Sequence, residues 1–539
     1  MAKPRQVSID RLRFGGRPES AVADRLRLEH LLAGAELWPA EMPPSAVLVV
    51  RRLVDPLPGR LVDAPGDLWP SPTWVNAVRV MLADLWRHAA RAQNGRLEAG
   101  ESAAAVAFRS GAEQAACLTL AIAEGAAARQ WWQQEALGTL SRATPAAALS
   151  SRPPGELPAI FALLAQWGEA EAVATRLSDP EAWALLQAMA DAYELTWAAA
   201  LPAPAVRDAA HGRRSELPGA TGATEPPATA PAPPAIGSTA TVGPHIERIP
   251  VASRGDTPHH ASPPGAQQAL LTLALALYHT PAVARSVAYA RRFQRWWEGR
   301  GPKPDAPPRP PYQPPTGTTP HSTQAPHRPA AADGAETAEE QPDDYEESLA
   351  EGVETRLGGL LYLINLLIRL ELQIPEVGVW ALLEAVGRAL LDQVDCDLLD
   401  DPIWQLLALL DGREPAYPAG QHCPPLPNPP TLPPEWPPIP QGPPYTPGPH
   451  SGNLSPHLQQ WLTLLIPYLT AWLRAALQPA EDDWLKALLL VPARIHVTET
   501  QVDLVLPLQA ASLPVRLAAL DRTPGWQPQF GRTITFYFE

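Results

Sequence analysis

The segment "DRTPGWQPQFGRTITFYFE" (521–539) contains the most strand-like stretch of the sequence. Within it, Ile534, Phe536 and Phe538 fall on one face of the expected strand, and Thr533 begins the opposite face. This period of two residues is typical of a β-strand. A Pro-Gly pair upstream indicates a turn. Because an isolated strand leaves its backbone N–H and C=O groups without partners, the pattern predicts a paired strand with Ile534 and Phe536 buried.

Two further segments near this end are also predicted to be β-structure. In "ARIHVTETQVDLVLPL" (493–508) the apolar residues alternate, but the parity shifts around Glu499. Such a shift indicates a tight turn or a bulge between two strands. In "LPVRLAAL" (513–520) every second residue is apolar, which predicts a third strand.

The beginning of the sequence has the same character. "VSIDRLRF" (7–14) and "AVLVVRRL" (46–53) are predicted strands, and residues 19–37 between them have the apolar spacing of a helix. We therefore expect the two ends of the chain to meet, either in one mixed sheet or in two adjoining small sheets.

Between these ends the sequence is mostly helical. Ser71 followed by Pro72 predicts a helix start, with Gly95 as its C-terminal stop. Asp179 before Pro180 predicts another start. The segment "ETRLGGLLYLINLLIRLEL" (354–372) is apolar on nearly every side, which predicts a central, buried helix. Short helical segments bury little surface alone, so we expect them to pack into one helical body.

Three stretches are too rich in proline or in small and polar residues to form a core. Sixty-seven of the 539 residues are proline, about 12% against an ordinary share of about 5%. They concentrate in residues 201–264, 301–347 and 414–449. Proline fixes φ and lacks a backbone donor, which excludes helix and sheet interiors and favours polyproline II or disorder. Such runs are either spacers or ligands for SH3-like grooves, and a spacer is the simpler interpretation.

The predicted fold class is α+β and mainly helical. A Trp/Leu-rich helical body carries a small β-rich unit that the N- and C-terminal segments form, and long Pro-rich disordered linkers interrupt it. The predicted units are a strand–helix–strand unit (1–60), a helical region (61–200), a disordered linker (201–264), a helical pair (265–300), a disordered linker (301–350), a helical region (351–413), a Pro-rich linker (414–455), and helices followed by a C-terminal β unit (456–539).

Charge and cysteine content limit the partners and the compartment. The formal net charge is −15, and an acidic chain repels phosphate backbones, so nucleic-acid binding is not expected. The three cysteines are too far apart for a disulfide framework or a CxxC metal site, which fits a reducing cytoplasm. The start of the sequence lacks the apolar region of a secretory signal. The uncharged stretch 265–284 is too short in its apolar part to cross a bilayer, so membrane insertion is not expected.

No sequence motif identifies a catalysed reaction or a bound cofactor. The sequence contains no GxxxxGK[ST], GxSxG, HExxH or GxGxxG pattern. The glycine pair at 15–16 is expected in a turn, and the pair at 358–359 at a helix-packing contact. No catalytic, cofactor-binding or metal-binding residue is assigned, and no cofactor is expected.

Several acidic and histidine residues are candidates for a cation site or an acid/base pair. The five aspartates Asp392, Asp395, Asp397, Asp400 and Asp401 have oxygen ligands for a cation but lack EF-hand spacing. A solvated helix end, with Asp401 capping the next helix, is the simpler interpretation. His496 and Glu499 are an acid/base pair only if a turn brings them together. His259 and His260, and the tripeptide Arg254 to Asp256, lie in a predicted linker without partners.

Tryptophan is the remaining compositional signal, with 18 residues that include the pairs Trp131-Trp132 and Trp296-Trp297. Large amphipathic rings serve both core packing and protein interfaces. Core packing is the simpler interpretation, and an interaction surface is the alternative.

Four segments together resemble a known group of proteins. They are "ELWPAEMPPSAVLVVRRLVDPLPG" (36–59), "RLGGLLYLINLL" (356–367), "HVTETQVDLVLPL" (496–508) and "LDRTPGWQPQFGRTITFYF" (520–538). They resemble uncharacterised bacterial proteins encoded beside extracellular contractile injection systems, which are phage-tail-like particles with a sheath, an inner tube and a baseplate. The resemblance implies a particle component or an assembly or loading factor, and it transfers no functional residue.

Three functional hypotheses follow. The first is a non-enzymatic structural, assembly or loading protein of such a particle, acting in the cytoplasm and binding baseplate, tube, sheath or assembly proteins. The second is an enzyme of unrecognised type that uses carboxylates such as Asp392 or Glu499. The third is an adaptor that recruits partners through its Pro-rich segments. A pocket that gathers several acids favours the enzyme, and a shallow surface with exposed tryptophans favours the interaction protein.

Overall fold

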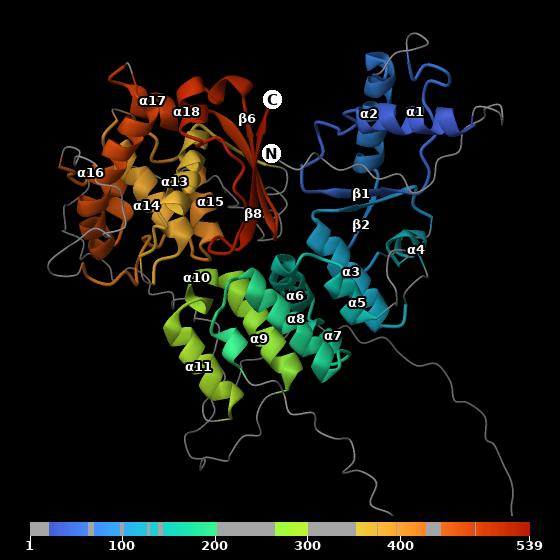
Figure 1. The fold of residues 1–539 in the computed structure, drawn as a ribbon, viewed down its shortest axis with the longest axis horizontal. Helices are drawn as coiled ribbons and strands as arrows, with labels where there is room; N and C mark the ends of the chain where they lie inside the picture. The colour runs from blue at the N-terminus through green and yellow to red at the C-terminus, as the bar shows by residue number, and fades with distance from the viewer. Residues whose placement is uncertain are drawn as a thin grey trace, which may run out of the picture.

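The computed structural model describes residues 21–539 except 63–68, 98–101, 127–129, 138–143, 202–264, 300–351, 375, 395, 427–443 and 480. Its described residues form an α+β fold that is mainly helical and contains two small sheets, as predicted. Figure 1 shows three parts: an N-terminal unit in blue, a helical body in blue-green to green, and a C-terminal body in yellow to red.

The N-terminal unit is built around a three-stranded sheet. Its elements are α1 (Ala21–Ala33), β1 (Val47–Val50), α2 (Pro72–Arg87), β2 (Ala90–Arg91) and β3 (Ala105–Phe108). The strand order is β1-β3-β2, with β1 antiparallel and β2 parallel to β3. The predicted strand at 46–53 and helix at 19–37 are confirmed. The predicted strand at 7–14 and the glycine pair at 15–16 lie outside the described residues.

The region 61–200 is not purely helical, contrary to the prediction. α2 begins after Ser71 as expected but ends at Arg87 rather than at Gly95. The chain then leaves the helix because residues 90–91 pair with β3. Gly95 lies in a turn with a φ of +77°, between the paired residues Gln93 and Arg96. Strand β3 has the sequence AVAF, and its signal in the sequence is weak because two of its four residues and the two residues before it are alanine.

The helical body combines two parts of the chain that a Pro-rich stretch separates. Its elements are α3 (Gly111–Ala123), α4 (Trp131–Leu137), α5 (Pro145–Ser150), η2 (Pro154–Glu156), α6 (Leu157–Gln166), α7 (Ala170–Ala174), α8 (Asp179–Ala192), η3 (Ala198–Ala200), α9 (Ala266–His279), α10 (Pro281–Ala284) and α11 (Val287–Trp297). One hydrophobic core contains residues from both sides of the gap, and α9 packs against α6 and α8. The expected helical pair at 265–300 is therefore three helices.

Helix α8 begins close to the predicted position, but its N-cap is one residue earlier than expected. Ser178, rather than Asp179, is the N-cap. Its hydroxyl accepts from the backbone N–H of Glu181, and the Glu181 carboxylate accepts from the backbone N–H of Ser178. This capping box leaves Pro180 in the first helical turn, where its missing N–H costs nothing.

The C-terminal body contains a five-stranded sheet packed against helices. Its elements are β4 (Val353–Thr355), η5 (Gly358–Tyr362), α13 (Leu363–Arg369), α14 (Val379–Leu391), α15 (Ile403–Leu410), η6 (His450–Asn453), α16 (Pro456–Leu477), α17 (Trp484–Leu489), β5 (Ala493–Val497), β6 (Gln501–Leu506), η7 (Leu508–Ala510), α18 (Leu513–Leu517), β7 (Gly525–Gln527) and β8 (Arg532–Phe538). The strand order is β4-β5-β6-β8-β7. β6 and β8 are parallel, and the other pairs are antiparallel.

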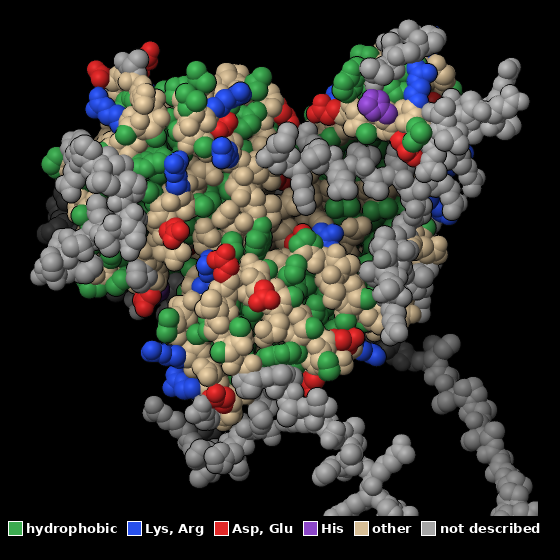
Figure 2. Space-filling view, in the orientation of Figure 1, with side chains coloured by type: hydrophobic (Ala, Val, Ile, Leu, Met, Phe, Trp, Pro, Cys, Tyr) green, Lys and Arg blue, Asp and Glu red, His purple; other side chains and the backbone are tan. Residues whose placement is uncertain are grey.

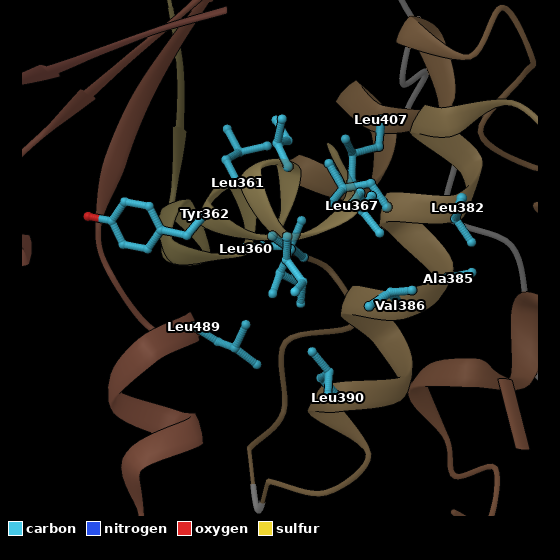
Figure 3. Packing of buried hydrophobic residues seen from close by; sticks show 14 of the residues in the cluster. Leu360, Leu361, Tyr362, Leu367, Leu382, Ala385, Val386, Leu390, Leu407 and Leu489 are labelled. Carbon is cyan, nitrogen blue, oxygen red and sulfur yellow. The ribbon is translucent and has the colours of Figure 1, made fainter. Parts of the chain in front are cut away.

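The segment predicted to be central is indeed buried. Residues 357–367 form η5 and α13, and nearly all of their apolar side chains lie in the core with those of α14 and α17 (Figure 3). The glycine pair permits this packing. A Cβ on Gly358 would collide with the Ala493 side chain, and one on Gly359 with the Leu488 carbonyl oxygen. The expected packing contact at 358–359 is therefore confirmed.

The last strand is paired and buried as predicted, but one of its expected neighbours is not a strand. β8 lies between β6 and β7, and Ile534 and Phe536 are buried. The turn expected near Glu499 separates β5 from β6. Residues 513–520, however, begin with the short helix α18, in which Leu513 and Leu517 are 68% and 76% exposed. Proline at position 514 suits the first turn of a helix and cannot donate to a sheet.

The described residues form two main cores rather than one, and two sheets rather than one mixed sheet. One core unites the helices of the helical body, and the other unites the C-terminal sheet with its helices. The two sheets approach each other where β3 ends and where β5 turns into β6, because Arg109 and Ser110 contact Glu499. The strands at the two ends of the chain therefore belong to adjoining sheets.

The predicted linker 414–449 is shorter than its composition suggests. Residues 414–426 and 444–449 are described, and Ala419, Cys423 and Tyr445 are buried against the C-terminal core. The backbone N–H of Ser455 donates to the Ala419 carbonyl, and the Trp461 indole donates to the carbonyl of Pro424. The prolines of this segment do not prevent its burial, because backbone carbonyl groups in it accept hydrogen bonds from the N-cap residue of α16 and from Trp461 within that helix. The remainder of the three predicted linkers lies largely outside the described residues.

Candidate functional site

A cavity of about 800 Å³ lies at one end of the five-stranded sheet. The strand ends at Thr355, Ala493 and Leu506 form its floor, and the loop before α15 forms a wall. We call this cavity the sheet-end groove. Its apolar lining consists of Leu398, Leu399, Pro402, Pro492, Ala493, Val505, Leu506 and Pro507, and its charged lining of Glu354, Arg356, Asp397, Asp400, Asp401, Arg494 and Glu539. Its volume is that of an ordinary binding pocket.

Asp401 ties the two walls of the groove together. One of its carboxylate oxygens accepts from the Thr355 hydroxyl at 2.6 Å and from the Ile403 backbone N–H at 3.0 Å. The other accepts from the Arg356 backbone N–H at 3.0 Å. The bond to Ile403 confirms that Asp401 caps the next helix, α15. Because three protein donors converge on this buried carboxylate, Asp401 fixes the shape of the groove.

The other charges of the groove face solvent. Glu354 pairs with Arg494 across β4 and β5 at 2.7 Å, and both side chains are exposed. Asp397 and Asp400 are exposed, and neither has an ion-pair partner among the described residues. Five carboxylates against two guanidinium groups give the groove a negative lining. Three of the five aspartates that the sequence singled out therefore meet in one place.

Asp392 belongs to a different site, which is structural. Its carboxylate accepts from the hydroxyls of Tyr445 and Ser451 and from the backbone N–H groups of Gly448 and His450. These bonds hold the end of the predicted Pro-rich linker against α14. The interpretation of this residue as part of a solvated helix end is wrong, because four donors surround it. Asp395 lies outside the described residues.

Glu499 lies at the joint between the two sheets and not in an acid/base pair with His496. Its carboxylate accepts from the Ser110 hydroxyl at 2.9 Å and lies 3.5 Å from the Arg109 guanidinium. Ser110 is also the N-cap of α3. Burial raises the pKa of neighbouring Glu113, whose carboxylate accepts from the Arg109 backbone N–H. His496 is buried in β5, directly opposite Asp503 of β6.

The C-terminal core contains a buried network of charged side chains that the sequence analysis did not predict. Glu384 lies in α14 and contacts both Arg388, at 2.8 Å, and Arg413. Arg413 also lies 3.3 Å from Asp411, whose carboxylate accepts from the Ala381 backbone N–H.

Burial shifts the titration of this network. It raises the pKa of Asp411 to about 7 and lowers the pKa values of both arginines to about 10. Glu384 and Arg388, four residues apart in an otherwise apolar helix, were the signal that could have revealed the network.

Most tryptophans serve packing rather than an open surface. Trp132 and Trp297, for example, are buried in cores, and Trp131 packs against the same core as Trp132. Among the tryptophans in the described ranges, Trp69 is the exception, with 68% of its surface accessible. Core packing was therefore the better interpretation, and a surface of exposed tryptophans is not the feature that marks a site.

Two of the remaining sequence candidates receive no structural answer. His259 and His260, and residues 254–256, lie outside the described residues. Within the described ranges, no three His, Cys, Asp or Glu side chains are placed so that they would hold a metal ion. Within those same ranges, no helix has both the length and the apolar character needed to span a bilayer.

Comparison with known proteins identifies no relative: no family model, no curated protein and no solved structure matches the chain.

Proposed function

We propose that the protein is a non-enzymatic structural, assembly or loading component of a phage-tail-like contractile injection system, acting by docking to other proteins in the cytoplasm of the producing cell. The partners we propose are baseplate, tube or sheath proteins, or their assembly factors. The proposal starts from the resemblance of four sequence segments and is supported by where those segments lie in the fold.

The observation that carries the proposal is that three of the four segments pack into one unit. Residues 356–367 form the central buried element, and residues 496–508 and 520–538 supply the end of β5 and all of β6, β7 and β8. Tyr362 and Phe536 meet edge to face with ring centroids 6.0 Å apart. The Asn365 side-chain amide donates to the carbonyl of Leu520 at 2.8 Å. The resembling segments are thus the core of a body, as expected for residues that preserve a shape.

The experiment is a deletion of the gene in the producing strain combined with affinity purification of the tagged protein. We expect fewer assembled or loaded particles from the deletion strain, and we expect particle proteins to co-purify with the full-length chain. Particles of normal number and cargo, together with a pull-down that contains no particle protein, would overturn the proposal.

A second candidate, an enzyme that uses carboxylates, is favoured by one observation: the sheet-end groove gathers Asp397, Asp400 and Asp401. Asp401 is bonded within the fold, which leaves two exposed aspartates of the three, and Glu499 lies at the joint instead. Restoring the deletion strain with Asp397→Asn/Asp400→Asn separates the candidates. Normal particle yield with loss of a newly found catalytic activity would favour the enzyme. The third candidate, a Pro-rich adaptor, rests on residues that lie largely outside the described ranges.

A further inference from the structure

The sheet-end groove has features of a peptide-docking site. Its floor is made of strand ends and prolines, so it is mostly apolar. Its rim carries Asp397 and Asp400, which have no ion-pair partner among the described residues, on one side and the Glu354–Arg494 ion pair on another. On the face of the molecule shown in Figure 2, acidic and basic side chains are scattered among uncharged ones. An apolar floor with a rim of one dominant sign recognises a ligand that has both apolar and oppositely charged groups.

The groove is also held in shape before anything binds. Asp401 fixes the wall to β4, as described above. The Gly358 backbone N–H donates to the Val491 carbonyl at 2.8 Å, which anchors the chain on either side of the floor. Backbone bonds of 2.9 Å join Glu539 to Leu506 and Leu508 to Glu539. A preformed surface avoids the ordering cost that a flexible one would meet on binding.

The apolar floor continues onto the surface beside the groove. Leu399, in the wall, is 43% exposed, and Leu508, which follows Pro507 of the lining, is 58% exposed. Exposed apolar surface that is continuous with a groove is a feature of protein-interaction sites and of ligand-binding grooves.

From these observations we propose that the sheet-end groove binds an extended segment of a partner protein in which leucine-like apolar residues alternate with lysine or arginine. The apolar side chains would lie on the floor, and the cationic ones would face Asp397 and Asp400. This inference rests on the proposed function, because it names the kind of partner segment through which the protein docks.

The direct test uses the full-length protein and a synthetic octapeptide of alternating leucine and arginine, with affinity measured by fluorescence anisotropy. The test variant is Asp397→Lys/Asp400→Lys. The matched control is Asp482→Lys/Asp483→Lys, which makes the same charge change at two exposed residues just before α17 and outside the groove. We expect the test variant to bind the peptide about tenfold more weakly or worse, since two exposed attractions become repulsions. We expect the control to bind as the unchanged protein does.

Several outcomes would overturn the assignment. Equal weakening in both variants would show attraction to net charge alone, and no weakening in either would show binding elsewhere. Binding of a leucine–glutamate octapeptide with the same affinity would contradict the charge argument. Tighter peptide binding after deletion of residues 301–347 would assign the groove to the chain's own segment. If the lysine variant does not fold, Leu399→Ser gives the second measurement, with an expected loss of several-fold from the apolar floor alone.

The failure of this inference is distinguishable from failure of the proposed function. If the Asp397→Lys/Asp400→Lys protein still co-purifies with particle proteins and restores particle yield, only the groove assignment falls. If the deletion strain makes normal particles and nothing co-purifies, the proposed function falls whatever the peptide does.

Discussion

Trp526 of the C-terminal body packs against the helical body, and its removal is the most informative perturbation of the contact between them. Trp526 lies in β7, the edge strand of the five-stranded sheet, yet it packs against the core of the helical body. Its indole N–H donates to the Ala192 carbonyl at 3.0 Å, and its ring meets Tyr193 edge-on at 5.1 Å. A Cβ on Gly155 would lie 2.6 Å from the same ring, so this glycine makes room for it.

The magnitude follows from these contacts. The hydrogen bond contributes about 1 kcal/mol, and the aromatic pair about 0.5–1.5 kcal/mol. Replacing a fully buried tryptophan by alanine costs about 3–5 kcal/mol, and this ring is half-buried. We therefore expect Trp526→Ala to weaken the association of the two bodies by about 2–4 kcal/mol, or roughly 30- to 700-fold in Kd.

The assay requires the two bodies to be separate molecules. A protease site placed within residues 301–347 and cleaved after purification leaves the helical body and the N-terminal unit on one piece and the C-terminal body on the other. The Kd of the two pieces is then measured by calorimetry. Trp526→Phe keeps a ring but removes the N–H, so we expect only about fivefold weakening. Trp69→Ala, a change at an exposed tryptophan in the N-terminal unit, is the matched control. A Kd for Trp526→Ala within twofold of that control would refute the reasoning.

Three other changes test separate parts of the structure. Phe536→Ala should lower the unfolding free energy of the C-terminal body by about 3–5 kcal/mol, because the ring is buried against Tyr362, and an unchanged melting temperature would contradict its place in the core. Burial raises the pKa of Asp411 to about 7 from its ordinary 3.8. The contribution of this group to the free energy of unfolding should therefore be greatest below pH 4 and should be lost as the pH rises through 7. The whole loss is on the order of 4 kcal/mol, of which about 3 kcal/mol lies between pH 4.5 and 7.5; urea denaturation at these two pH values should show no such difference for Asp411→Asn. Glu499→Ala should weaken the association of the two cleaved pieces by about 1–2 kcal/mol, because it removes the bonds to Ser110 and Arg109. Kd values that do not change between low and high salt in either protein would argue against that ionic contact.

Local patterns predicted the elements whose neighbours are close in sequence. The alternation in residues 533–538 predicted β8, and the parity shift near Glu499 predicted the turn between β5 and β6. The apolar character of residues 356–367 on every side predicted their burial. These patterns work because strand period, turn geometry and burial each constrain a few consecutive residues.

The failures have equally specific causes. Leu513, Val515 and Leu517 alternate as in a strand, but positions i and i+4 also share one face of a helix, so five residues did not distinguish the two. β4 pairs with β5 although about 140 residues separate them, and no local pattern records such a pairing. The parallel pairing of β6 with β8 is likewise set by packing and by the crossover between them.

The candidate site was even less visible in the sequence, because five separated stretches build the groove. The sequence shows the aspartates in residues 397–401 as a cluster, but they form only one wall. The opposite wall and the floor come from β4, from residues 492–494, from the end of β6 and from Glu539. Composition showed that acids were present, and only the sheet topology showed which acids share a cavity with apolar strand ends.

One strand connects the joint with the groove. β8 begins at Arg532, whose guanidinium donates to the Thr498 carbonyl beside the turn that carries Glu499. It continues along β6 to Phe538, and the next residue, Glu539, lines the sheet-end groove. Seven residues of strand span roughly 20 Å, so the two sites are at opposite ends of one rigid element.

Coupling between the groove and the joint through β8 requires a specific condition. A ligand in the groove changes the joint only if it binds two arrangements of the bodies with different affinity. The cleaved pieces measure this directly, since a coupled groove requires the leucine–arginine octapeptide to change their Kd. An unchanged Kd with peptide bound would mean that β8 holds the groove and the joint at a fixed separation, and that docking at one leaves the other as it was.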